Sequence, residues 1–352
     1  MFKNIFSLLV MAAITIAAIA GVSYYMAPRD FLSNIALLEP QNGPTAYAVF
    51  EIDSAALQRT KLDQISEDMA AALRVANPPI RYTGRGVVDD AARIRLVSPA
   101  DMPRARAALA NVANAAGAPD TIAYTERQDG IIEARIPFTV ARDNIRLAIA
   151  QSIQIINRRV NPSGTAPVTV TPQGETRILV EARNMADSTR LRSLIGPAGA
   201  LTFHTVREVS VEDAAAGHIP PGTMLVQPYP GSPAYAEVVE STPRLTGAHI
   251  ADARPSADPA TGEVVLTFQF DDEGARIFCN ITRQSVGERF AVLIDNQVVT
   301  APRINEAICG GSGQINGNFT MQSASDLAII LRAGAMPAPL SLIEEGLRPV
   351  AN

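Results

Sequence analysis

The chain has 352 residues, a formal net charge of −5 at pH 7, 47% hydrophobic residues and 18% charged residues. This length allows two or three domains, and the hydrophobic fraction is sufficient for a large core, which excludes wholesale disorder. The acidic balance argues against a nucleic-acid-binding protein, because such proteins usually carry a basic face. Only Lys3 and Lys61 among the 30 basic residues are lysines. A codon bias toward arginine would explain the scarcity of lysine. The alternative is a protein surface whose arginines make bidentate contacts with carboxylates of a partner.

The first hydrophobic segment runs from Ile5 to Met26, which makes 22 residues without a charge. A helix of that length crosses a hydrocarbon core of about 30 Å, so we predict one N-terminal transmembrane helix as an anchor over residues 1–28. Lys3 precedes the segment, whereas Arg29 after it is offset by Asp30, and this balance weakly favours an N-terminus inside the cell. The sequence therefore predicts a single-pass membrane protein with the bulk of its chain exported.

A cleaved signal peptide is the alternative to an anchor. Residues 18–20, Ala-Ile-Ala, form a small-x-small triplet of the kind that signal peptidase recognises, and they follow a short apolar run. The apolar run continues through Val22 to Tyr24 and Tyr25, whose rings suit the membrane interface and favour the anchor. The sequence leaves open whether the chain is cleaved after Ala20, and both alternatives export the bulk of it.

The two cysteines, Cys279 and Cys309, lie in the part of the chain that is predicted to be exported, where disulfides form. A bridge between them would close a loop of about 30 residues and could contribute about 3–4 kcal/mol to stability by the loop-entropy relation. The alternative is two buried free thiols, on a helix and on a strand that do not meet. The sequence does not decide between these alternatives.

Three groups of elements recur after residue 44. In the first group, Ser54 is expected to cap a helix whose apolar residues, from Leu57 to Leu73, recur at helical spacing. Gly84 and Gly86 are expected near the turn of a hairpin. The predicted order is strand 47–52, this helix, strands 80–85 and 87–97, a helix from Asp101 to Gly117, and strand 121–125. This order predicts a ferredoxin-like arrangement.

Two further groups repeat this order. The second has strand 130–138, a helix through 145–160, a hairpin of strands 168–170 and 177–180, a helix around Leu191 and strand 201–206. The third has strand 264–270, a helix capped by Asp271, a hairpin around Asp295-Asn296, a helix with Leu327 and Leu331, and Leu340. Proline and glycine crowd residues 208–245, which predicts a surface insertion outside the core. The predicted fold class is α+β, with ferredoxin-like βαββαβ units and antiparallel sheets whose edges could accept a strand from an unfolded chain.

No motif in the chain assembles the groups that an enzyme needs. Residues 310–313, Gly-Gly-Ser-Gly, lack the lysine of a phosphate-binding loop, so a turn with positive φ angles explains the glycines. The acidic run 271–274 suits a helix N-terminus better than a calcium loop. The histidines at 204, 218 and 249 are scattered, without the spacing of zinc ligands. We therefore predict a chain that is not an enzyme and that binds no cofactor, metal or nucleic acid.

Four short motifs follow one another without large gaps near the end of the chain. They are Gly274-Ala-Arg-Ile-Phe278, Leu293-Ile-Asp295, Gly310-Gly-Ser-Gly-Gln-Ile315 and Leu331-Arg-Ala-Gly-Ala-Met-Pro-Ala-Pro339. This series resembles the periplasmic region of SecD, the accessory subunit of the Sec protein-export translocon. A weaker likeness extends to residues 156–161, Ile-Asn-Arg-Arg-Val-Asn, and to residues 173–180.

The resemblance implies the P1 region of that family, with a base domain over residues 40–190 and a mobile head domain over residues 195–340. In the family this region is thought to capture polypeptide that emerges from the SecYEG channel. The implied partners are SecY, SecE, SecG, SecF, a full-length SecD and unfolded exported polypeptide. The candidates for substrate or partner contact are Gly310, Gly311, Ser312 and Gly313, and those for a hinge are Gly196, Pro197 and Gly199.

The sequence departs from the family pattern at three places. Residues 40–44, Pro-Gln-Asn-Gly-Pro, replace an Asp-Leu-x-Gly-Gly segment, and residues 182–184 replace a Pro-Gly pair. No membrane bundle follows Pro339 before the sequence ends at Asn352. The resemblance therefore implies a protein that assists export without conducting protons by the family's route. The alternative is an independent periplasmic adaptor or scaffold with a P1 fold and no role in export.

Overall fold

The computed structural model describes residues 43–115, 121–127, 129–164, 166–185, 187–259 and 261–348. The predicted anchor at residues 1–28 and the cleavage site after Ala20 lie outside these ranges. Over the described ranges, no helix unites the length and the apolar character that crossing a bilayer requires. The described strands form four sheets, and the pairing of neighbouring strands is antiparallel except between β9 and β15. This confirms an α+β protein with antiparallel sheets.

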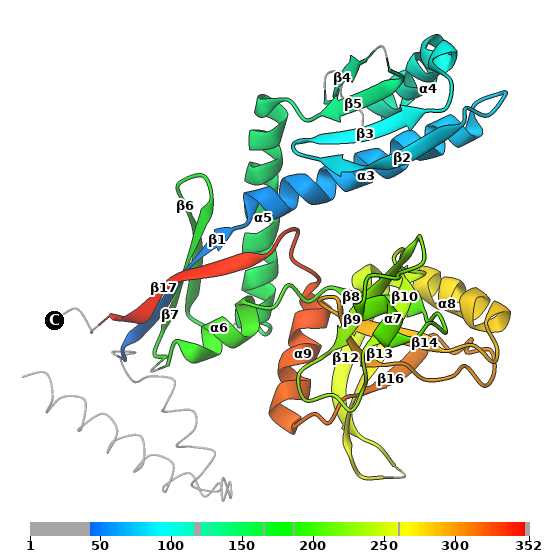
Figure 1. Cartoon of the computed structure of the whole chain (residues 1–352). Helices are drawn as coiled ribbons and strands as arrows, with labels where there is room; N and C mark the ends of the chain where they lie inside the picture. Colours follow the sequence, from blue (N-terminus) through cyan, green and yellow to red (C-terminus); the bar gives the residue numbers. More distant parts are fainter. Residues whose placement is uncertain are drawn as a thin grey trace, which may run out of the picture. The chain divides into compact units, whose positions relative to one another are not determined.

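The first sheet, called the β1 sheet, has four antiparallel strands in the order β17-β1-β7-β6. They are β1 (Thr45–Ile52), β6 (Val168–Gln173), β7 (Arg177–Arg183) and β17 (Leu340–Arg348). Alternate residues of β1, Ala46, Ala48, Phe50 and Ile52, are at most 2% exposed, as expected when one face of a strand is buried. Helices α5 (Phe138–Val160) and α6 (Thr189–Ile195) pack on this face. Figure 1 shows β17 alongside β1, although the two strands are far apart in the sequence.

The second sheet, called the β3 sheet, is formed by the chain between β1 and α5, and its order is β2-β3-β5-β4. Its elements are α3 (Ser54–Val75), β2 (Tyr82–Val88), β3 (Ala91–Leu96), a 3-10 turn (Pro99–Asp101), α4 (Met102–Ala115), β4 (Ala123–Glu126) and β5 (Ile131–Arg135). The cap of α3 is Asp53 rather than the predicted Ser54, because the Asp53 carboxylate accepts a hydrogen bond from the Ala56 N–H at 2.8 Å. The β2–β3 turn lies at Asp89, whose φ is +55°, rather than beside Gly84 and Gly86.

The predicted grouping of these elements into consecutive units is wrong in three places. Strand β1, assigned to the first unit, pairs with β7 and β17. Strand β5, expected to open the second unit, pairs with β3 and β4 and completes the first unit's sheet. The strand over residues 201–206, expected to close the second unit, pairs with β14 of the third. Local hydrophobic pattern identifies a strand, but the partner of that strand depends on which buried faces fit together.

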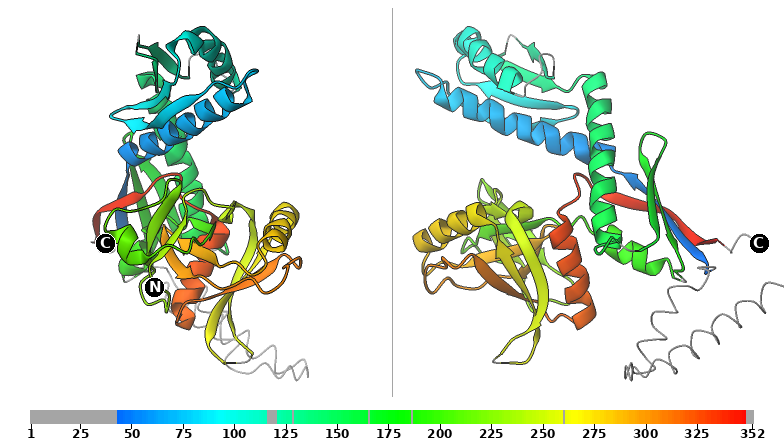
Figure 2. Two further views of the ribbon diagram at one scale, coloured as in Figure 1. Left: turned by 45° about the vertical axis from the view of Figure 1, so that its right-hand side comes forward. Right: turned by 180° about the vertical axis from the view of Figure 1, so that it is seen from behind.

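The remaining elements form the six-stranded β14 sheet, in the order β10-β9-β15-β14-β8-β11, and the three-stranded β13 sheet, in the order β12-β13-β16. Figure 2 shows them from two further sides. The strands are β8 (Leu201–Thr205), β9 (Thr223–Pro228), β10 (Glu237–Glu240), β11 (Leu245–Thr246), β12 (Ile250–Ala257), β13 (Val264–Phe270), β14 (Phe290–Ile294), β15 (Gln297–Thr300) and β16 (Ser312–Asn316). The helices are α7 (Val211–Ala215), a 3-10 turn (Gly247–His249), α8 (Asp272–Gln284) and α9 (Met321–Ala333).

A cluster of phenylalanines joins these two sheets. Phe203 of β8 lies at the centre, with ring centroids 5.6–6.1 Å from those of four neighbours. The four neighbours are Phe268, Phe270, Phe278 and Phe290. Such tilted and offset pairs add to the stabilisation that burial of the rings provides. All five rings are at most 5% exposed, so this cluster lies in the core of the C-terminal part of the described chain.

Residues 208–245, predicted to be a surface insertion, contribute strands to the β14 sheet. Val226, Val238 and Val239 from this segment are at most 2% exposed. A bridge between Val206 and Val239 also brings β10 back to the end of β8. The prediction was wrong because prolines at 220, 221, 228, 230 and 233 lie mainly in the connections, whereas the short apolar runs between them form the strands. Two other predictions are confirmed, since Asp271 caps α8 and the Asp295-Asn296 turn, with φ angles of +50° and +61°, joins β14 to β15.

Candidate functional site

Two segments connect the β1 sheet with the β14 and β13 sheets, and both converge on one arginine. The first segment, residues 196–200, follows α6, and the second, residues 334–339, follows α9. Arg159 of α5 is fully buried between them. Its Nη1 donates to the carbonyls of Leu194 and Pro197 at 3.2 and 2.5 Å, and its Nη2 donates to those of Ala198 and Gly334 at 2.7 and 3.0 Å. We call this arrangement the Arg159 clamp.

Burial strongly affects the Arg159 guanidinium. Desolvation lowers the pKa of Arg159 to about 10, and the charge of Asp295 opposes this effect. The group therefore remains protonated at neutral pH, so a full positive charge is held by carbonyl dipoles rather than by a bonded carboxylate. A buried charge is costly unless hydrogen bonds satisfy it. The four carbonyls supply that compensation to Nη1 and Nη2, whereas the buried Nε has no hydrogen-bond partner among the described residues. The carbonyls do so only while both connecting segments keep their positions.

The two connecting segments are also bonded to each other and to the β14–β15 turn. The Met336 N–H donates to the Ala198 carbonyl at 2.9 Å. Asp295 accepts from the Ala200 N–H at 2.8 Å and its own N–H donates back to the Ala200 carbonyl at 3.0 Å. On the side of the helices, Arg190 of α6 forms an ion pair with Asp326 of α9. These hydrogen bonds and this ion pair thus hold the entry and the exit of the C-terminal part.

The predicted hinge residues lie inside this set of bonds. Gly196 has helical backbone angles at the end of α6, and the Pro197 carbonyl is bonded to Arg159. Gly199 has a φ of +76°, which disfavours any residue with a side chain. A Cβ atom at Gly199 would lie 2.4 Å from Cγ2 of Ile330 and 2.7 Å from Nη2 of Arg159. Rotation at this segment would therefore have to open the Arg159 clamp, and the hinge stays a prediction.

We expect Gly199→Ala to lower the free energy of unfolding by about 2–3 kcal/mol. The loss has two causes, because the alanine Cβ is strained at a positive φ and is overpacked against Ile330. Gly174→Ala is the matched control, because its φ of +68° is similar and nothing lies within 4 Å of the added Cβ. The control should lose only the backbone part, about 1 kcal/mol. Urea denaturation of both variants measures the difference, and equal losses would show that the close approach at Gly199 does not matter.

The residues at 310–313, predicted to contact substrate or partner, form the entry into β16. Gly311 has a φ of +69°, and a Cβ there would lie 2.8 Å from Cβ of Ala275. A Cβ at Gly313 would lie 2.6 Å from the ring of Phe268, opposite which it pairs in β13. Packing therefore explains these two glycines. Gly310 and Ser312 are exposed. They are the two residues of this segment that could contact a substrate or partner, and this contact stays a prediction.

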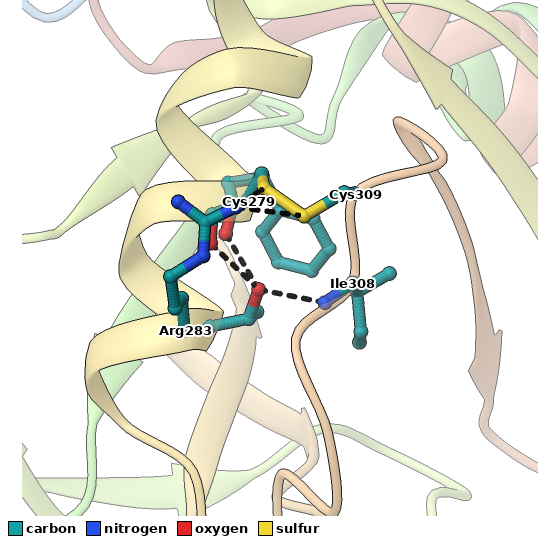
Figure 3. Close-up of a disulfide and its surroundings, with 6 residues drawn as sticks. Cys279, Arg283, Ile308 and Cys309 are labelled. Carbon is teal, nitrogen blue, oxygen red and sulfur yellow. Dashed lines mark hydrogen bonds between the residues drawn. A yellow bond between two sulfur atoms is a disulfide. The ribbon is translucent and has the colours of Figure 1, made fainter.

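The structure joins Cys279 of α8 to Cys309 by a disulfide, with the two Cα atoms 4.4 Å apart (Figure 3). The bridge attaches the segment before β16 to α8. Beside it, the buried Thr282 hydroxyl accepts a hydrogen bond from the Ile308 N–H at 2.9 Å. The alternative of two free thiols that do not meet is therefore wrong.

The histidines do not form a common site. His204 is buried in β8, where its Nδ1 lies 2.7 Å from the Glu240 carbonyl, and burial lowers the pKa of His204. His249 lies 3.4 Å from the Asp271 carboxylate at the start of α8. Across the described residues, no three His, Cys, Asp or Glu side chains are grouped so that they could hold a metal ion.

Arg159 is the residue that sequence reasoning missed. It lies within the stretch 156–161 that carries part of the family likeness, three residues after Ile156 on the buried face of α5. A charged residue at a position that helical spacing assigns to the core was the available signal. That signal identifies an unusual arginine, but it does not reveal the carbonyls that surround it, since they come from segments 35 to 175 residues away.

Comparison with known proteins gives matches over two ranges of the chain, which together contain the Arg159 clamp. The family model "SecDF, P1 head subdomain" matches residues 225–338. The family model "Protein translocase subunit SecDF, P1 domain, N-terminal" matches residues 149–208. The β3 sheet lies before the first of these matched ranges.

Curated relatives are named protein translocase subunit SecD. The relative from Rickettsia conorii is 40% identical over 205 residues, which cover 58% of this chain and 39% of the relative. The relative from Acetobacter pasteurianus is 37% identical over 230 residues, which cover 64% of this chain and 43% of the relative. The chain thus spans about two fifths of the length of these relatives.

A solved structure described as "Structure and function of a membrane component SecDF that enhances protein export" is 30% identical, with a TM-score of 0.45, and the match covers 56% of this chain and 92% of that one. The two family models match in order along the chain, and their ranges contain the parts of the Arg159 clamp, with Arg159 and Ala198 in the first range and Gly334 in the second. Residues 149–208 and 225–338 are therefore similar to the P1 region of the SecD family.

Proposed function

We propose that this protein is an accessory component of the Sec protein translocase that assists export by engaging polypeptide on the periplasmic side of the inner membrane. The single observation that carries the proposal is the pair of P1 family matches, at residues 149–208 and 225–338, in the order expected for that region. The names of the curated relatives support it. The activity, substrates and partners are proposals, because the chain covers only 39–43% of those relatives.

The proposed partners are SecY, SecE, SecG and SecF, a full-length SecD, and unfolded exported polypeptide. The proposed placement is an inner-membrane anchor over residues 1–28, with the bulk of the chain in the periplasm. A role without catalysis fits the names of the relatives, which are translocase subunits.

We further propose a base domain over residues 40–190 and a head domain over residues 195–340. The order β17-β1-β7-β6, numbered along the chain, corresponds to 4-1-3-2, which supports a ferredoxin-like β1 sheet interrupted twice. The first interruption contains the β3 sheet, and the second contains the β14 and β13 sheets. In this proposal β17 completes the base although it follows the head in the sequence.

A periplasmic adaptor without a role in export is the alternative. It shares the fold of the proposed translocase component and differs in its partners. The SecD names of the relatives favour the translocase role. The alternative would apply if cells without a functional head processed exported precursors normally.

We expect precursors of exported proteins to accumulate when residues 201–333 are replaced by a short Gly-Ser linker. The ends of this excision are neighbours, because Ala198 and Met336 are hydrogen-bonded at 2.9 Å, so the strands of the β1 sheet can keep their order. Pulse-chase labelling in the native host, with expression from the chain's own promoter, measures the half-time of precursor processing. The intact chain with a linker inserted at the exposed Gly217 is the control.

A processing half-time in the excision strain equal to that of the control strain, with both proteins present at equal level, would contradict the export role of the head.

A further inference from the structure

The disulfide between Cys279 and Cys309 lies at the surface, beside a cation. Cys309 is exposed, and Cys279 is half-buried on α8. Arg283 follows Cys279 by one turn of α8, and its Nη2 lies 3.3 Å from the Cys279 sulfur and 3.7 Å from the Cys309 sulfur (Figure 3). One exposed guanidinium thus contacts both sulfurs of the bridge.

This arrangement matters for the chemistry of the bridge. Disulfides exchange when a thiolate attacks one sulfur and the other sulfur leaves as a thiolate. A neighbouring arginine stabilises a thiolate and lowers the pKa of the corresponding thiol, so the sulfur beside it leaves more readily. Cys309 is the more exposed of the two residues, and the Cys279 sulfur is the one closer to Arg283.

We propose that the Cys279–Cys309 bridge is a thiol–disulfide exchange site for a dithiol reductant. One reductant thiolate attacks the Cys309 sulfur, the bond between the two protein sulfurs breaks, and its electron pair leaves with Cys279 as a thiolate beside Arg283. The reductant is then joined to Cys309 through its first sulfur. Its second thiolate attacks that first sulfur, closes the reductant's disulfide and displaces Cys309 as a thiolate. Two electrons pass to the protein, the reductant becomes a disulfide, and the protein thiolates take up protons from water according to pH.

A contact beside the bridge favours a reversible reaction. The Ile308 N–H donates to the buried Thr282 hydroxyl, which itself donates to the Phe278 carbonyl at 2.9 Å. This bond places the residue before Cys309 against α8 independently of the sulfur–sulfur bond. In the reduced protein it holds the two thiols near each other, so a small disulfide can restore the bridge by the reverse exchange and is itself reduced to thiols.

Exchange at this site changes how the entry into β16 is attached. In the oxidised protein the segment ending at Cys309 is covalently tied to α8, and it leads directly to residues 310–313. In the reduced protein the Thr282–Ile308 hydrogen bond and the bond from the Phe270 N–H to the Gly311 carbonyl remain. Reduction therefore loosens the exposed Gly310 and the segment before it, while β16 stays paired in the β13 sheet.

The test is the rate of reduction of the purified full-length chain by dithiothreitol without denaturant. Samples are quenched with a maleimide-linked polymer, and the number of free thiols is counted from the shift on a gel. We expect Arg283→Gln to slow reduction about eightfold at low ionic strength, the factor that a pair of unit charges separated by the 3.3 Å between Nη2 and the Cys279 sulfur gives in water. High salt should reduce the difference, because the charge is exposed and screened.

Arg276→Gln is the matched control, because Arg276 is exposed on the same helix and its guanidinium lies 3.8 Å from Glu273. It should reduce at the wild-type rate, and Arg283→Lys should keep most of that rate. Equal rates for Arg283→Gln and Arg276→Gln would overturn the proposal, as would a wild-type bridge that dithiothreitol opens only in urea. Failure of the bridge to re-form when the reductant is replaced by oxidised dithiothreitol would also contradict it.

Discussion

Replacing Arg159 by methionine is expected to lower the free energy of unfolding by about 4 kcal/mol. Methionine fills a similar space but donates no hydrogen bond, so the carbonyls of Leu194, Pro197 and Gly334 lose the donor that the structure gives them. Leaving buried polar groups without partners costs about 1–3 kcal/mol each, and breaking a buried ionic arrangement costs about 3–5 kcal/mol in total. Chemical denaturation followed by far-UV circular dichroism measures the loss.

Arg158→Met is the control for this experiment. Arg158 is the preceding residue of α5, is exposed, and reaches the Ala333 carbonyl only at 3.5 Å. Its replacement should change the free energy of unfolding by less than about 1 kcal/mol. If both variants lost the same free energy, the Arg159 clamp would not be the contact that holds the two connecting segments together.

Replacing both cysteines by serine is expected to lower the free energy of unfolding by about 3.5 kcal/mol. The bridge between Cys279 and Cys309 closes a loop with a sequence separation of 30, and the loop-entropy relation gives this value for about 30 residues. The effect acts mainly on the unfolded chain, so the fold of the variant should be unchanged. Thermal unfolding of the wild type and of the Cys279→Ser/Cys309→Ser variant, both without reductant, measures it.

A reductant supplies the control. Full reduction should bring the wild type close to the double serine variant, and the variant should not respond to the reductant at all. A wild type whose thermal midpoint is the same with and without full reduction would contradict a stabilising bridge. A response of the double variant would mean that the reductant acts elsewhere in the chain.

The sequence was sufficient for the elements whose signals are local. Asp271 precedes an apolar helical pattern and caps α8, and the Asp295-Asn296 pair adopts the positive φ angles of a two-residue hairpin turn. The turn at residues 174–176, which joins β6 to β7, is likewise predicted from neighbouring residues. In each case neighbouring residues alone decide the backbone conformation, and no distant contact is needed.

The sequence was insufficient where distant segments decide the structure. An alternating strand such as β1 fits several sheets equally well, and its pairing with β17 depends on a segment almost 300 residues away. The same limit applies to residues 208–245, where short strands between prolines gain their stability from β8 and β15. Arg159 is the corresponding case in the candidate site, because its carbonyl partners meet only in the folded chain.

The role in export is tested most directly by crosslinking in the living membrane. A photoreactive side chain placed at the exposed Ser312 samples the predicted contact segment, and one at the exposed Thr171 of β6 serves as the comparison on the β1 sheet. Crosslinked chains are purified through a tag on the full-length protein and identified by mass spectrometry. The proposed function predicts SecY, SecF or precursors of exported proteins among them. Recovery of unrelated envelope proteins from both positions, with translocase subunits and precursors absent, would contradict it.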